Sequence, residues 1–170
     1  SILLAILIAC FGVVESQPVV TYDTIMPLEK YNFVLGTNTI GGKYQFTTDS
    51  KLLEQAKHVR AMGSNIIKIS LGANSPKAYD LPISQKPTTT LDLFKASPEY
   101  RKVFDMDFNY VFVWVHTMTG IEWKKGITKD QEKVLYDEMF DFASYLLKEY
   151  NNSGKTFLIG NWEGDWLLHP

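Results

Sequence analysis

Four short runs of apolar residues, separated by longer amphipathic stretches, constrain the fold of this chain of 170 residues most strongly. The runs cover 32–36, 65–71, 110–115 and 156–159, and we interpret each as a β-strand. Strands half exposed to water would alternate polar and apolar residues, so near-continuous apolar runs predict a parallel sheet covered on both faces. The fold class is therefore α/β, with parallel β-strands alternating with helices.

The stretches between the runs carry helix signals. We expect Asp49 to cap the first helix and Gly63 to end it, and we expect Thr128 and Gln131 to form a capping box. The segment between the second strand and Thr90 is expected to be a long loop. The predicted helices cover 50–62, 91–96, 98–106 with Ser97 as N-cap, and the stretch from the capping box to about 150.

Four strands with three complete helices do not close a barrel of eight strands. The sequence, which lacks an initiator Met, is therefore expected to be truncated, with 32–170 forming the first half of a TIM (β/α)₈ barrel. A complete four-stranded doubly wound domain remains the alternative.

The uncharged apolar run over 2–14 has the character of a signal-peptide core. We expect a signal peptide over 1–16, a connector over 17–31, and a secreted mature protein without a transmembrane span. Two alternatives remain: a lipobox over 7–10 that lipidates Cys10, and a buried N-terminal element of the fold.

Charge and motifs exclude several partners. A net charge of −2 without clustered Lys and Arg argues against nucleic acid. The Gly-rich stretch 36–44 has the wrong spacing for a phosphate-binding loop and places Tyr44 where Ser or Thr is required. His58 and His169 lack ligand partners at helical spacing, so we expect neither a metal site nor a cofactor.

Polar residues follow the predicted strands, at the end where parallel α/β proteins bind ligands. They are Asn38 after the first strand, His116 after the third, and Asn161 and Glu163 after the fourth. His116 is expected to hydrogen-bond a substrate or, alternatively, backbone carbonyls at the strand end.

Glu163 is the candidate general acid. Burial beside Trp162 would raise the pKa of its carboxyl, which suits proton donation near neutral pH. A structural carboxylate, either paired with Lys68 or hydrogen-bonded to loop amides, is the alternative.

Three tryptophans, Trp123, Trp162 and Trp166, lie in or beside the same loops, whereas Trp114 lies within a strand and is expected in the core. Indole faces pack against the C–H faces of sugar rings. We therefore expect a carbohydrate partner.

The order of strand, long loop and helix, with His116 after the third strand and Asn161-x-Glu163 after the fourth, resembles clan A of the glycoside hydrolases. These (β/α)₈ barrels include cellulases and mannanases. The resemblance implies retaining hydrolysis of a β-linked poly- or oligosaccharide, with Glu163 as acid/base, Asn161 contacting the sugar 2-hydroxyl and His116 contacting the sugar at the cleavage point.

Two positions depart from the clan pattern: Trp162 separates Asn161 from Glu163, which are adjacent in the clan, and Lys68 stands where cellulase-like members commonly carry Arg. The nucleophile, expected after a seventh strand, is missing from this fragment, which we expect to be inactive alone. A non-catalytic carbohydrate-binding or cell-surface barrel remains the alternative function.

Overall fold

The computed structural model describes residues 30–31, 33, 35–39, 44–83 and 85–161. The predicted signal peptide, Cys10 and nearly all of the predicted connector lie outside these residues, as do Trp162, Glu163 and Trp166.

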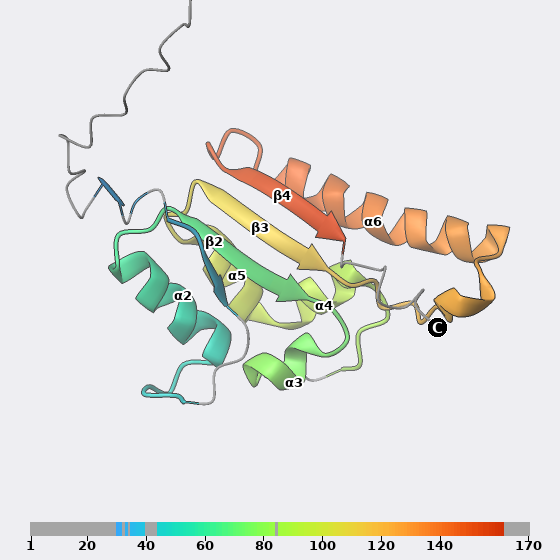
Figure 1. The fold of residues 1–170 in the computed structure, drawn as a ribbon, viewed down its shortest axis with the longest axis horizontal. Helices are drawn as coiled ribbons and strands as arrows, with labels where there is room; N and C mark the ends of the chain where they lie inside the picture. Colours follow the sequence, from blue (N-terminus) through green and yellow to red (C-terminus); the bar gives the residue numbers. More distant parts are fainter. Residues whose placement is uncertain (1–29, 32, 34, 40–43, 84, 162–170) are drawn as a thin grey trace, which may run out of the picture.

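The described strands form one parallel sheet (Figure 1). Its strands, in the order β1-β2-β3-β4, are β1 (Thr37–Thr39), β2 (Ile66–Leu71), β3 (Tyr110–Val115) and β4 (Thr156–Asn161). Each strand pairs in parallel with the next, which confirms the predicted α/β class. The sequence order equals the spatial order, as in successive βα units wound in one direction.

Helices connect the strands. They are α2 (Lys51–Ala61), α3 (Ser75–Tyr79), α4 (Thr90–Ala96), α5 (Pro98–Asp105), the 3₁₀ turn η1 (Trp123–Lys125) and α6 (Lys129–Glu149). The capping box of Thr128 and Gln131 is confirmed, and so is the left-handed Gly63, with φ +96°. The predicted cap Asp49 is wrong, because the Ser50 side chain accepts the hydrogen bond from the Leu53 amide.

The first predicted strand, 32–36, is wrong. β1 begins at Thr37, where backbone pairing with Ile67 starts. The Leu35 amide instead donates to the Tyr31 carbonyl, which is a helix-type turn. The side chains of Phe33 and Leu35 are exposed, so pairing with β2 rather than local hydrophobicity decides where the strand starts. The predicted long loop after β2 also contains a short helix, α3.

The described helices cover one face of the sheet (Figure 1). This covered face bears Ile67, Ile69 and Leu71 of β2 and Val111, Val113 and Val115 of β3, all buried in one core with helix residues. Ring stacking joins α5 to β4, since the centroids of Phe104 and Phe157 lie 5.4 Å apart.

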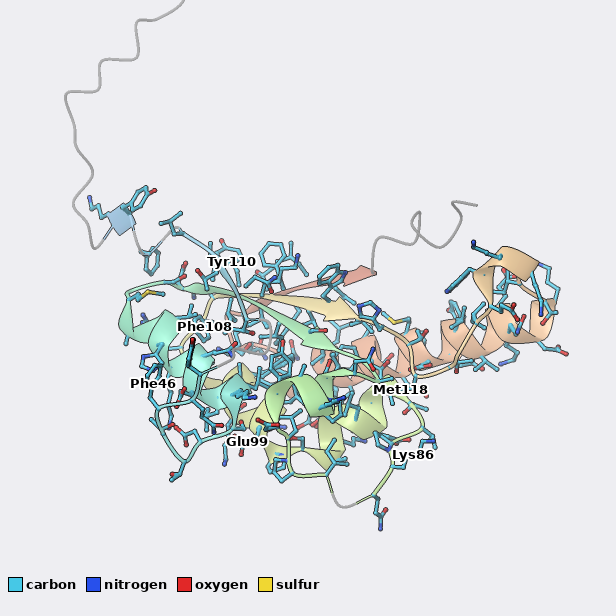
Figure 2. All side chains as sticks on the ribbon, turned by 60° about the horizontal axis from the view of Figure 1, so that its bottom comes forward. Phe46, Lys86, Glu99, Phe108, Tyr110 and Met118 are labelled. Carbon is cyan, nitrogen blue, oxygen red and sulfur yellow. The ribbon has the colours of Figure 1, made fainter. Side chains whose placement is uncertain are left out.

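We call the opposite side the uncovered face; it bears Lys68, Tyr110, Phe112, Trp114 and Leu158. In the part of the chain that the structure describes, no helix packs on it, so the predicted cover on this second face is not found within these residues. Tyr110 is 44% exposed and is labelled on this side in Figure 2, and Phe112 is 38% exposed. Trp114, expected in the core, is half-buried here. Near-continuous apolar runs therefore do not by themselves show that two helix layers are present.

None of the helices within the described ranges is long and apolar enough to cross a membrane.

Candidate functional site

The four parallel strands end at one edge of the sheet, which we call the carboxyl edge. Leu71, Val115 and Asn161 are the last residues of β2, β3 and β4, and the register pairs Leu71 with Val115 and Val115 with Asn161. Ligands of open parallel α/β sheets bind at this edge. His116 directly follows β3 at this edge and Asn161 ends β4 there, whereas Asn38, expected after the first strand, lies within β1 and pairs in register with Lys68.

A cavity of about 330 Å³ opens at the end of β2. We call it the β2 cavity, and its lining is Ser70, Gly72, Ala73, Asn74, Ser75, Ala78, Tyr79 and His116. Its polar groups are hydroxyl, amide and imidazole groups, which hydrogen-bond neutral polar ligands well.

Buried hydrogen bonds fix the wall of this cavity. The Tyr79 hydroxyl accepts from the Ser70 amide at 2.9 Å and donates to the Thr39 carbonyl at 2.5 Å. The Gly72 amide donates to the Ser75 hydroxyl at 3.0 Å, and that hydroxyl donates to the Ser70 hydroxyl at 3.3 Å. Burial raises the pKa of Tyr79, so it stays a neutral hydroxyl. The wall is therefore preorganised by its own bonds.

His116 stands against this wall. Its amide donates to the Leu71 carbonyl at 2.9 Å, which carries the pairing of β2 and β3 one residue beyond the strand. A Cβ at position 72 would lie 2.5 Å from the His116 Cβ, so only glycine fits there. Burial lowers the pKa of the His116 imidazole. A neutral imidazole, with one donor and one acceptor nitrogen, is the form expected at neutral pH.

Two buried carboxylates hold loops at this edge from the helix side. Glu138 of α6 accepts hydrogen bonds from the Thr90 amide at 2.8 Å, the Thr90 hydroxyl at 2.6 Å and the Met118 amide at 2.6 Å. Because Met118 lies two residues after His116, Glu138 fixes the loop that carries the imidazole. Met118 is labelled in Figure 2.

Glu54 of α2 plays the same part for the loop after β1. It accepts from the Phe46 amide at 2.9 Å, and from the Thr47 amide and hydroxyl at 2.6 Å each. The bond from the Thr47 hydroxyl lowers the pKa of this carboxyl below the ordinary glutamate value. Both glutamates have their oxygens engaged by the fold, which assigns them a structural role.

The structure places the predicted site residues of its described ranges at separate positions. His116 lines the β2 cavity, and its ring centroid lies 5.8 Å from that of Trp114. Asn38 is exposed on β1 as the register partner of Lys68. Trp123 is 37% exposed in η1, between β3 and α6.

Asn161 closes β4 opposite Val115. Glu163, Trp162 and Trp166 lie outside the described residues, so their predicted roles stay predictions.

Sequence reasoning missed the segment after β2. Ser70, Asn74, Ser75 and Tyr79 all line the β2 cavity, yet the stretch was interpreted only as a loop. The run of small and polar residues directly after β2, Gly72-Ala73-Asn74-Ser75, was the available signal. Pro76 near the start of α3 was a further sign of the short helix that shapes this wall.

Within the described ranges, no group of three or more His, Cys, Asp or Glu side chains is arranged to hold a metal ion. Comparison of the chain with protein-family models, curated proteins and solved structures finds no match.

Proposed function

We propose that this chain is the first half of a (β/α)₈ barrel of a secreted glycoside hydrolase that acts with retention on a β-linked poly- or oligosaccharide. The observation that carries the proposal is the uncovered aromatic face of a parallel sheet, which runs into a neutral polar cavity beside His116. In a (β/α)₈ barrel the helices cover only the outer face of the strands, and the site lies at their carboxyl ends.

In this proposal Glu163 protonates the leaving glycosidic oxygen. A second carboxylate, on the later half of the barrel, attacks the anomeric carbon from about 5–5.5 Å away, the separation that retaining enzymes use. Water then hydrolyses the glycosyl-enzyme intermediate with Glu163 acting as base.

The remaining candidates bind the substrate. His116 and Asn161 hydrogen-bond sugar hydroxyls, Asn38 extends the site toward β1, and Trp123, Trp162 and Trp166 pack against sugar rings. Burial lowers the pKa of His116 and so favours the neutral imidazole. This supports the proposed hydrogen bonds to sugar, because a neutral imidazole both donates to and accepts from hydroxyl groups.

The test is hydrolysis of cellulose, mannan, xylan and β-glucan by the full-length protein and its Glu163→Gln variant. We expect Glu163→Gln to abolish turnover, because the amide has no proton to transfer. Glu122→Gln is the matched control and should leave turnover unchanged, since Glu122 is exposed in the loop after β3 and pairs with Lys125 at 2.8 Å. Undiminished turnover in Glu163→Gln would exclude Glu163 as acid/base.

A second candidate is a carbohydrate-binding barrel without hydrolysis, which the neutral lining of the β2 cavity favours. Trp162→Ala should then weaken glycan binding by about 0.5–1.5 kcal/mol, while Glu163→Gln should leave affinity unchanged. The pH profile separates the two candidates. Hydrolysis with Glu163 as acid declines on the alkaline side as this carboxyl deprotonates, whereas a binding protein shows no turnover at any pH.

A further inference from the structure

Lys68 places a cation on the uncovered face, beside the carboxyl edge. Its Nζ lies 4.4 Å from the centroid of the Trp114 ring. The register pairs Lys68 with Phe112 and Ser70 with Trp114, so the Lys68 side chain extends two residues along the sheet toward the carboxyl edge. The ammonium therefore lies near the level of Ser70 and Trp114, one residue before the ends of β2 and β3.

This ammonium has no carboxylate partner among the residues that the structure describes. No carboxylate of the described ranges lies within 4.0 Å of it, although Lys51, Lys57, Lys102, Lys125, Lys129 and Lys133 each form an ion pair. The register partners of Lys68 are Asn38 and Phe112, an amide and an aromatic ring. The Lys68 side chain is partly exposed, so an anionic ligand can reach its ammonium and form a charge-assisted hydrogen bond with it.

Space for a ligand adjoins the Trp114 ring beside this ammonium. Gly160 is the register partner of Trp114, and a Cβ at Gly160 would meet no atom within 4 Å. The indole is therefore open toward β4, where a sugar ring can pack against it.

We propose that Lys68 is a specificity-determining residue that binds the anionic group of an acidic sugar whose ring lies against the open part of Trp114. The ligand class is a β-linked oligosaccharide carrying a uronate carboxylate or a sulfate ester. This inference rests on the proposed function for its location, but it concerns binding and selectivity. The β2 cavity, whose lining includes Ser70 two residues after Lys68, takes sugar hydroxyls, and Lys68 supplies the charge that selects the acidic unit.

The experiment measures binding by calorimetry to the full-length protein carrying Glu163→Gln, so that hydrolysis does not obscure affinity. The probes are a neutral β-linked oligosaccharide, the same length of oligosaccharide with uronate units, and its sulfated counterpart. We expect Lys68→Met to weaken binding of the acidic probes by about 10- to 100-fold, the value of a charge-assisted hydrogen bond, and to leave the neutral probe unaffected. The uronate and sulfated arms identify which anionic group binds more tightly.

Two variants serve as controls. Lys95→Met removes a cation of matched geometry on the helix side, where Nζ lies 5.1 Å from the Tyr145 ring centroid, and should change no affinity. Lys68→Arg keeps the charge and should retain most of the binding of acidic probes. If Lys68→Met does not fold, the affinities of the Lys68-containing protein are compared instead. Tighter binding of acidic than of neutral probes that is lost at high salt supports the inference, and equal binding contradicts it.

Two results would overturn the inference. One is equal affinity of the Lys68-containing protein for neutral and acidic probes. The other is loss of neutral-substrate hydrolysis in Lys68→Met with Glu163 intact, which would show that Lys68 holds a carboxylate of the protein itself. If the wild type binds acidic probes through Lys68 but hydrolyses nothing, the inference stands and the proposed hydrolase function fails.

Discussion

The two faces of the sheet differ although they are built from the same apolar strands. On the covered face, Ile67 and Val113 are fully buried against helices, whereas on the uncovered face their chain neighbours Lys68 and Phe112 remain partly exposed. The covered face has one packed core of aliphatic and aromatic side chains. The uncovered face combines aromatic rings with a cation and adjoins the β2 cavity. The difference indicates that the described helices stabilise the fold through one face, whereas no helix of the described ranges packs on the other.

The largest expected effect is on the covered face. Phe104→Ala should lower the free energy of unfolding by about 3–5 kcal/mol, because it empties a fully buried site between Phe94 and Phe157. Urea unfolding followed by circular dichroism measures the change. If Phe104→Ala lowers the free energy of unfolding by less than the substitution of an exposed residue does, packing of the helices on the covered face does not stabilise the fold.

Glu138→Gln comes next. The amide nitrogen of glutamine can only donate, so at least one donor among Thr90, Met118 and Thr119 loses its acceptor, and we expect a loss of about 1–3 kcal/mol. Glu132→Gln on the same helix is the control, since its carboxylate is exposed and pairs only with Lys129. Equal losses in the two variants would remove the special role given to Glu138.

A smaller effect follows from Glu54. Its pKa is lower in the folded chain than the unfolded value of about 4.3. The ionised Glu54 carboxylate therefore contributes fully to the free energy of unfolding above that value. This contribution is lost as the pH falls through the pKa of Glu54 in the folded chain. Unfolding midpoints in urea between pH 6 and pH 3 should fall, and Glu54→Gln should reduce this pH dependence. An unchanged pH dependence of the unfolding midpoint in Glu54→Gln would contradict the stabilising role given to the hydrogen bonds of Glu54.

The smallest effect is expected on the uncovered face. Phe112→Ala should change the free energy of unfolding of this 170-residue chain by about 1 kcal/mol or less, because the ring is 38% exposed and no helix packs on it. A loss as large as that of Phe104→Ala would show that a further part of the chain covers this face.

Local sequence signals predicted some elements and not others. The strand at 110–115 was predicted with its observed bounds because its run of β-branched and aromatic residues is unambiguous, and the capping box at Thr128 fixed the start of α6. β1 was misplaced because three residues, Thr37–Thr39, form a strand only through pairing with β2. Local pattern therefore predicts an element best where tertiary pairing does not decide its bounds.

The site was predictable only in part. The end of the third strand indicated His116, whereas Asn38 was expected after the first strand and lies within β1. The roles of Glu54 and Glu138 depend on donors that the fold brings to them. The position of Lys68 over Trp114 follows from the register of β2 and β3, which no local pattern reveals.

Thiol labelling at positions 112 and 113 tests most directly whether the uncovered face is the inner wall of a barrel. In a Cys10→Ser background, which removes the one native thiol, Phe112→Cys and Val113→Cys place a thiol on opposite faces. In the 170-residue chain, Phe112→Cys should label rapidly and Val113→Cys slowly, since Val113 is 1% exposed.

In the full-length protein with the proposed remaining strands, Phe112→Cys should become as protected as Val113→Cys. Rapid labelling of Phe112→Cys in both proteins would contradict the barrel, because its interior is packed with side chains.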